Sequence, residues 1–162
     1  MGLISDLPCL LSGCLLLSTL GEGAVANKTS TRSRCPPDYV YISGWCYVAF
    51  GDLLSWSEAY LECARLTEGA SLATIRNEQD QQILGHLLAS TTARKQAWIG
   101  LRRSNGYRWV WVDGSRFRLQ PFDLLPWSAG YDCAVLDTSG DSPTWVAESC
   151  SNKNSFICQM PT

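Results

Sequence analysis

The chain has 162 residues, with 13 lysines and arginines against 15 aspartates and glutamates, and its formal net charge is −2. This length suits one domain after removal of a leader, and the charge gives no reason to expect nucleic acid as a partner. Because the only histidine is His86 and no nucleophile motif is present, the ingredients of a catalytic triad are missing and we predict no enzyme activity.

Residues 1–26 are predicted to form a secretory signal peptide. An apolar stretch from Leu7 to Leu20 precedes Ala24-Val25-Ala26, which is a small-x-small cleavage site. The alternative is an uncleaved anchor, but so short a stretch would span only about 21 Å as a helix, less than the roughly 30 Å of hydrocarbon in a bilayer. No other segment is apolar enough for a membrane span. We therefore expect a secreted, extracellular protein.

A polar lead over residues 27–34 follows the predicted cleavage site. It has no hydrophobic pattern, so we expect it to be flexible. Asn27-Lys28-Thr29 is an N-glycosylation sequon, which makes Asn27 a candidate glycosylation site.

Six cysteines remain once Cys9 and Cys14 leave with the signal peptide. An even number in an exported chain predicts a disulfide framework. The alternative, a structural zinc site, needs cysteines and histidines at short spacing, and the sequence has no Cys-x-x-Cys. We therefore expect disulfides, no metal and no cofactor, with about 15 pairings open.

Two helices are predicted after an N-terminal hairpin. The β-rich runs Tyr39–Ile42 and Trp45–Phe50 flank Ser43-Gly44, which is a turn signal. Ser55-Trp56-Ser57-Glu58 is a capping box and predicts a helix start; its apolar face has helical spacing and contains Trp56, Ala59, Tyr60 and Cys63. Asn77 is a good N-cap for a second helix, predicted to expose its acids and glutamines and to bury Ile83, Leu84, Leu87 and Leu88.

Strands are predicted for most of the remaining chain. Gln96–Leu101 and Tyr107–Val112 are expected to be strands joined by Arg102–Gly106. Alternation in the second strand places Tyr107, Trp109 and Trp111 on one face and Arg108, Val110 and Val112 on the other. Asp113-Gly114 is a turn signal, and three further strand-like segments follow: Asp132–Leu136, Pro143–Val146 and Ser155–Gln159.

Local signatures in this order resemble the C-type lectin-like domain family. They are Trp45-Cys46-Tyr47, the Ser55–Ala59 helix start, Leu72-Ala73-Thr74-Ile75, Trp98–Leu101, Trp111–Ser115 and Phe156-Ile157-Cys158.

The resemblance implies an α+β fold over residues 35–160, with two helices packed on small antiparallel sheets and a shortened long-loop region. It also selects one cysteine pairing, with no interchain bridge: Cys35–Cys46, Cys63–Cys158 and Cys133–Cys150. The second of these bridges would close a long loop. In the chain-entropy model this would stabilise the folded state by on the order of 4–5 kcal/mol.

Calcium-binding members of the family supply oxygen ligands from two motifs, and calcium needs roughly six to eight oxygens. One is a Trp-Asn-Asp motif, which appears here as Trp145-Val146-Ala147, with hydrocarbon in place of both oxygen-bearing side chains. The other is a carboxylate–proline–amide motif in the long loop. Trp127–Gly130 matches the family's Trp-x-x-Gly, but Tyr131-Asp132-Cys133 follows directly, so this motif is missing. We predict that the usual calcium-dependent sugar site is lost.

The shortened segment Pro126–Gly130, together with Trp111–Arg116, looks most like the branch that contains eosinophil granule major basic protein. Members of that branch lack the usual calcium site and are associated with heparin-like polyanions. This chain departs from the branch because its predicted mature form is neutral and because no long acidic propeptide precedes Cys35.

Basic residues are concentrated in one part of the sequence. From Arg94 to Arg118 the only acid is Asp113, whereas Asp123–Glu148 contains acids and no base. Such asymmetry can attract an anionic glycan, and the planar guanidinium suits sulfate. The alternative is that these arginines are ordinary solvated residues. The candidate anion-binding residues are Arg102, Arg103, Arg108, Arg116 and Arg118.

The sequence thus favours a secreted recognition module that works without the standard calcium site. Its ligand is predicted to be a carbohydrate, with an anionic heparin-like glycan as one candidate, or a protein. Two alternatives stay open: a calcium-dependent sugar-binding lectin with a rearranged site, and a defence or structural extracellular protein.

Overall fold

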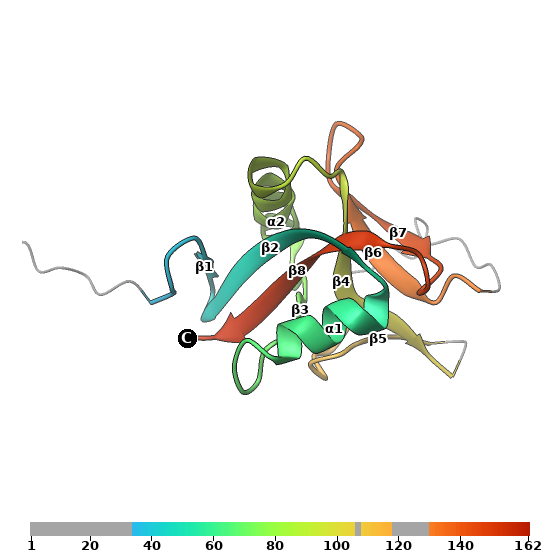
Figure 1. The fold of residues 1–162 in the computed structure, drawn as a ribbon, viewed down its shortest axis with the longest axis horizontal. Helices are drawn as coiled ribbons and strands as arrows, with labels where there is room; N and C mark the ends of the chain where they lie inside the picture. Colours follow the sequence, from blue (N-terminus) through green and yellow to red (C-terminus); the bar gives the residue numbers. More distant parts are fainter. Residues whose placement is uncertain (1–33, 106–107, 118–129) are drawn as a thin grey trace, which may run out of the picture. The chain divides into compact units, whose positions relative to one another are not determined.

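Eight strands and two helices make up the part of the chain that the structure describes (Figure 1). The computed structural model describes residues 34–105, 108–117 and 130–162, so the predicted signal peptide, Asn27 and Arg118 lie outside the described residues. The helices are α1 (Trp56–Ala64) and α2 (Glu78–Thr91). The strands are β1 (Val40–Ile42), β2 (Trp45–Leu54), β3 (Ser71–Leu72), β4 (Gln96–Ser104), β5 (Arg108–Trp111), β6 (Cys133–Asp137), β7 (Thr144–Glu148) and β8 (Asn154–Pro161).

The strands are joined in one sheet, which confirms the predicted α+β class. Their order is β1-β2-β8-β4-β6-β7, with β3 paired to β8 and β5 paired to β4. The last strand of the chain, drawn in red in Figure 1, lies beside β2 at the middle of this order. All pairings are antiparallel except that of β4 with β8, which is parallel.

The hairpin between β1 and β2 turns on Ser43 and Gly44. Both have positive φ, 48° and 94°, as a two-residue hairpin turn that matches strand twist requires. Ile42 is therefore paired with Trp45. This is the turn that the sequence predicted.

Both helices begin where their capping residues predicted. The Ser55 backbone N–H donates to Glu58 Oε2 at 2.8 Å, and the Asp80 backbone N–H donates to Asn77 Oδ1 at 2.8 Å. One expectation for α2 was wrong, because Asp80 is buried and does not face water. Its carboxylate accepts the Arg76 backbone N–H at 3.1 Å, which gives the buried oxygen a partner. No helix that the structure describes is long and apolar enough to cross a membrane.

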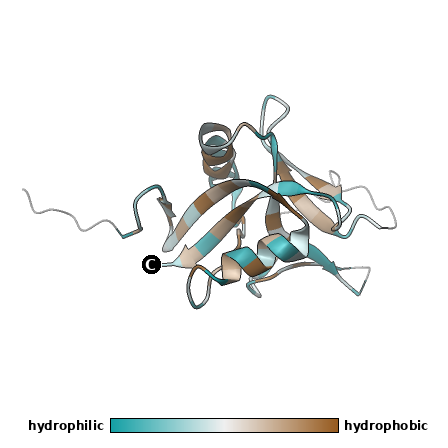
Figure 2. Ribbon diagram, viewed as in Figure 1, coloured by the Kyte–Doolittle hydropathy of each residue, from teal (hydrophilic) through white to brown (hydrophobic). Residues whose placement is uncertain are grey.

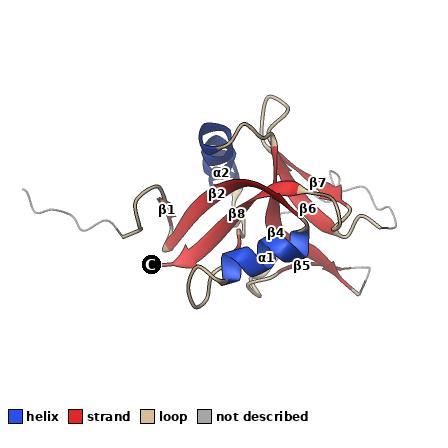
Figure 3. Cartoon of the chain, in the orientation of Figure 1, coloured by secondary structure: helices blue, strands red, loops and turns tan. Residues whose placement is uncertain are grey.

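The two helices cover opposite faces of the β2–β8 pair (Figure 3). Side chains alternate along a strand, so Tyr47 and Ala49 pack in the apolar cluster that includes α2, whereas Val48 packs in the cluster that includes α1. The same alternation divides β8, where Ile157 lies in the first cluster and Phe156 in the second. Apolar residues are accordingly spread along these strands (Figure 2).

Three disulfides tie these layers together: Cys35–Cys46, Cys63–Cys158 and Cys133–Cys150. This is the pairing that the family resemblance implies. Cys63 and Cys158, which are 95 residues apart in the sequence, link α1 to β8, and both are fully buried.

Strand β4 extends further than the sequence predicted. Arg102 and Arg103 were expected in a turn, but β4 continues to Ser104. The reason is that this segment has two partners: β5 pairs along it, and on the other side Arg102 is paired with Cys133 while the Arg103 backbone N–H donates to Asp132 O at 2.8 Å.

Candidate functional site

The register of β4 against β5 divides the predicted arginine cluster between the two faces of the sheet. Residues directly opposite each other share a face, and here Arg103 is paired with Trp109 and Arg102 with Val110. Because successive residues alternate between faces, Arg108 lies on the face of Arg102. The cluster is therefore not one surface.

Arg103 lies on the buried face and is not part of an exposed anion-binding surface, which corrects the sequence prediction. It is only 7% exposed, and its Cζ lies 4.9 Å from the centroid of the Trp109 ring. Its Nε has no hydrogen-bond partner among the described residues. The stacking offsets part of the cost of burial, because the face of an aromatic ring attracts a guanidinium.

Arg102 is exposed, but it contacts a different part of the fold. Its Cζ lies 5.8 Å from the centroid of the Trp56 ring at the start of α1. Arg118 lies outside the described residues. Of the five candidates, the structure brings Arg108 and Arg116 together.

A hollow of about 540 Å³ lies along β5, and Arg108 and Arg116 both line it. Both arginines are exposed. Strand β5 pairs only with β4 among the described strands. No lining residue is acidic; the others are Trp109, Val110, Trp111, Gly114, Ser115 and Phe117.

Aromatic rings fix the segment that carries Arg116. Phe117 follows it directly, and the Phe117 ring lies 6.2 Å from both Trp111 and Trp145, measured between ring centroids. Trp111 and Trp145 are buried and meet edge to face at 5.4 Å, an arrangement that aromatic pairs favour. The Arg116 backbone is thus held against the core while its side chain stays exposed.

Strand β7 carries the residues that stand where the family places one of its calcium-ligand motifs. Trp145 and Ala147 are buried and Val146 is half-buried, so hydrocarbon fills these positions. Within residues 34–105, 108–117 and 130–162, no group of three or more His, Cys, Asp or Glu side chains could hold a metal ion.

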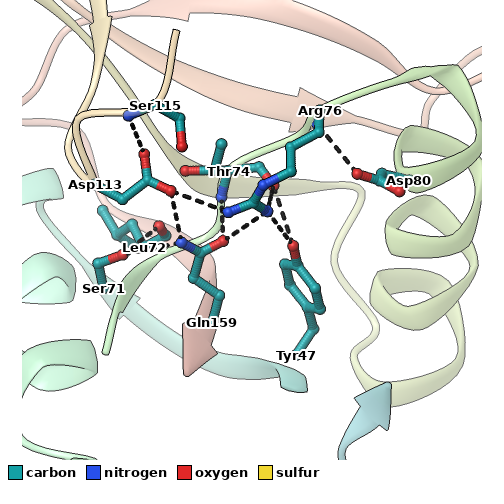
Figure 4. Close-up of polar contacts among 9 residues, drawn as sticks. All are labelled: Tyr47, Ser71, Leu72, Thr74, Arg76, Asp80, Asp113, Ser115 and Gln159. Atoms are coloured by element: carbon teal, nitrogen blue, oxygen red, sulfur yellow. Dashed lines mark hydrogen bonds and ion pairs between the residues drawn. The ribbon is translucent and has the colours of Figure 1, made fainter. Parts of the chain in front are cut away.

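A polar network anchors the turn next to the hollow (Figure 4). The Arg76 guanidinium donates to Tyr47 Oη at 2.7 Å and lies 3.1 Å from Asp113 Oδ2. Gln159 Nε2 also donates to Asp113 Oδ2, at 3.0 Å, and the Ser115 backbone N–H donates to Oδ1 at 2.9 Å. Both carboxylate oxygens are therefore occupied, and one of them fixes the backbone just before Arg116.

This network also determines the charges beside the hollow. Burial raises the pKa of Asp113, but hydrogen bonds from Ser115 and Gln159 outweigh it and hold the pKa below its ordinary value. Burial also raises the pKa of Tyr47 to about 12, even though Arg76 opposes the shift. Asp113 is thus ionised and Tyr47 neutral at physiological pH. Because Arg76 is paired with Asp113, the net positive charge comes from Arg108 and Arg116.

A second, smaller hollow adjoins the first. It measures about 320 Å³ and is lined by Arg76 and Arg116 together with Thr74, Ile75, Trp111 and Ser115. Sequence reasoning missed Arg76. The available signal was Asp113, the only acid in the basic run, since a lone acid there needs a cationic partner.

Comparisons with known proteins agree with the fold. The family described as "Lectin C-type domain" matches residues 52–160. Regenerating islet-derived protein 4 of Homo sapiens is 27% identical over 146 residues, 90% of this chain and 92% of that protein. Dromaiocalcin-2 of Dromaius novaehollandiae is 34% identical, covering 79% and 96%. The crystal structure of ovocleidin-17, a major protein of the Gallus gallus eggshell calcified layer, superposes with a TM-score of 0.69 at 30% identity, covering 79% and 99%.

Proposed function

Because the chain belongs to the family of C-type lectin domains, we propose that it is a secreted, non-catalytic recognition module that binds an acidic glycan in the hollow along β5 without a calcium ion. One observation carries the proposal: Arg108 and Arg116, from separate segments, line one hollow that has no acidic lining residue.

The chemistry of the two arginines suits sulfate and carboxylate groups. Each guanidinium presents a planar fork that donates two hydrogen bonds to one anionic group. Asp113 does not compete for them, because its oxygens already accept from Arg76, Ser115 and Gln159. Arg108 and Arg116 are exposed and form no ion pair with any acid that the structure describes. They give a local positive field despite the negative net charge of the chain.

Calcium independence is part of the proposal. The oxygen-bearing side chains of the family motif are replaced by Val146 and Ala147, and a hard cation gains nothing from hydrocarbon. Placement in the branch containing eosinophil granule major basic protein stays a prediction, since its segment Pro126–Ala129 lies outside the described residues.

Retention on immobilised heparin tests the proposal. We expect the secreted chain to bind at low salt, in the presence of chelator, and to elute as salt is raised, because exposed charges are screened within about 8 Å at physiological ionic strength. A variant with Arg108→Ser and Arg116→Ser should elute at clearly lower salt.

The matched control removes the same charge elsewhere. Arg34→Ser with Arg65→Ser changes two exposed arginines that line neither hollow. This control should elute like the parent. Equal elution of the Arg108/Arg116 variant and the control would reject the hollow as the site, and binding that chelator abolishes would instead support a rearranged calcium site.

A further inference from the structure

A third basic hollow, separate from the two beside Arg116, lies at the opposite end of β4 from Arg108. It measures about 340 Å³, and its basic lining residues are Arg94, Lys95 and Lys153, with Ser139, Asn154 and Ser155 among its polar ones. All three basic side chains are exposed. No lining residue is acidic.

Strand topology brings these residues together from distant parts of the sequence. Because β4 and β8 are parallel neighbours, with Ala97 paired to Ser155, they begin at the same edge of the sheet. Lys95 immediately precedes β4 and Lys153 immediately precedes β8. The antiparallel strand β6 ends at this edge and brings Ser139 to it.

The backbone at this edge is firmly held. Thr138 donates to Lys95 O from its backbone N–H at 2.8 Å and from its hydroxyl at 3.0 Å. The Ser155 hydroxyl donates to Gln96 O at 2.5 Å, which links the starts of β4 and β8. The backbone that carries the basic side chains is therefore already in place, and a ligand does not have to order it.

Two nearby acids, Asp137 and Glu58, offset only part of the positive charge of the three basic side chains. The Asp137 carboxylate accepts from Gln96 Nε2 and from the Ser139 N–H, both at 2.7 Å. Glu58 pairs with Lys153 at 2.5 Å, but both side chains are about half exposed, and such surface pairs are weak. Arg94 and Lys95 form no ion pair within the part of the chain that the structure describes.

We propose that the hollow formed by Arg94, Lys95 and Lys153 is a second anion site, which takes a sulfate or carboxylate group of an acidic glycan. The ligand class rests on the proposed function, but the site is separate from the hollow along β5. The hollow along β5 lies beside Leu101–Ser104 of β4, whereas Lys95 immediately precedes Gln96. At about 3.3 Å per residue, the two sites are separated by roughly 20–30 Å.

This separation determines what each ligand can do. A compact anion occupies one site at a time. A long acidic glycan reaches both, and its second contact then forms at a high effective concentration. Alternatively, two glycan chains are held by one protein molecule and become cross-linked.

Sucrose octasulfate, a compact polyanion, separates the two sites experimentally. We expect a titration followed by amide NMR at low salt to shift two groups of signals, one from Gln96, Ser139 and Asn154 and one from Gly114 and Ser115. Calorimetry should give two molecules bound per chain.

Three variants assign the sites. Arg94→Ser with Lys95→Ser should abolish the first group of shifts and reduce the stoichiometry to one. Arg108→Ser with Arg116→Ser should abolish only the second group. The control Arg34→Ser with Arg65→Ser should keep both.

The outcomes distinguish this inference from the proposed function. It is overturned if the first group of signals does not shift in the parent, if those shifts persist in the Arg94/Lys95 variant, or if the control loses them equally. If the first group shifts and the second does not, the inference stands and the hollow along β5 is rejected.

Discussion

The guanidinium of Arg76 lies 3.1 Å from the carboxylate of Asp113, and this ion pair connects the segment before α2 to the turn after β5. Both side chains are largely shielded from water, at 27% and 11% exposure. The pair therefore holds the backbone that leads to Arg116, although 37 residues separate its members in the sequence.

Replacing Asp113 by Asn should destabilise the fold by about 1–3 kcal/mol, because it leaves a largely shielded guanidinium without its counterion. Urea unfolding measures the change. Asp141→Asn is the control, since Asp141 is exposed and should shift stability by less than about 0.5 kcal/mol. Equal effects of the two variants would show that the ion pair does not stabilise the fold.

The contribution of Asp113 should depend on pH. Its folded-state pKa lies below the unfolded value, which is about 3.9 for aspartate. The stabilisation is therefore fully present above that value and is lost as pH falls through the folded pKa. Unfolding of the parent and of Asp113→Asn at several pH values should show the gap closing on acidification. A gap that stays constant below pH 4 would contradict this.

Millimolar calcium should not raise the melting temperature. A native-state site with a Kd near 10 µM would add about 2.7 kcal/mol at 1 mM calcium, which calorimetry detects easily. Chelator added to the same sample is the control. A calcium-dependent rise that the chelator reverses would mean that residues other than those at Val146 and Ala147 supply ligands.

Removing the bridge between α1 and β8 should be costly. Cys63→Ala with Cys158→Ala opens a loop of 95 residues, so we expect a loss on the order of 4–5 kcal/mol in urea unfolding. Peptide mapping without reduction should first find Cys63 joined to Cys158 in the parent. A loss below about 1 kcal/mol would indicate that the loop is restrained in other ways.

Arg103→Met should leave heparin retention unchanged, because Arg103 is buried and lines none of the three hollows described above. Its guanidinium has no ion pair among the described residues, and replacing a buried charged group by an apolar one is often neutral or stabilising. Elution and urea unfolding measured on the same preparation test both expectations. Lost retention in a folded variant would return Arg103 to the binding site.

Local signals predicted the fold well. The turn at Ser43-Gly44 and the capping box Ser55–Glu58 each depend on only a few neighbouring residues. The hairpin and the start of α1 were therefore predictable. The extent of β4 was not, because nothing in Arg102 or Arg103 itself favours a strand; the partners β5 and β6 do. Because Arg103 belongs to β4 and not to a turn, the alternation of side chains along the strand places it on the buried face. This explains the error for Arg103.

The candidate site was only partly predictable for a related reason. Composition located the basic segment, but composition does not say which side chains share a hollow. Arg76 pairs with Asp113, and Lys95 and Lys153 line one hollow, only because the fold brings together segments that are far apart in the sequence. Asp80 shows the same limit, because it is buried and its carboxylate accepts the Arg76 backbone N–H, a contact that helical spacing does not predict.

The central position of β8 also affects how the protein is made. Ribosomes deliver the chain from its N-terminus, yet β2, β3 and β4 all pair with a strand that ends at Pro161. A nascent chain therefore cannot complete this sheet until β8 has emerged, and the Cys63 thiol has no native partner until Cys158 emerges. Until then, the apolar faces of both helices have no completed sheet to cover them. Folding factors in the compartment of synthesis therefore encounter a domain whose apolar surfaces are still exposed.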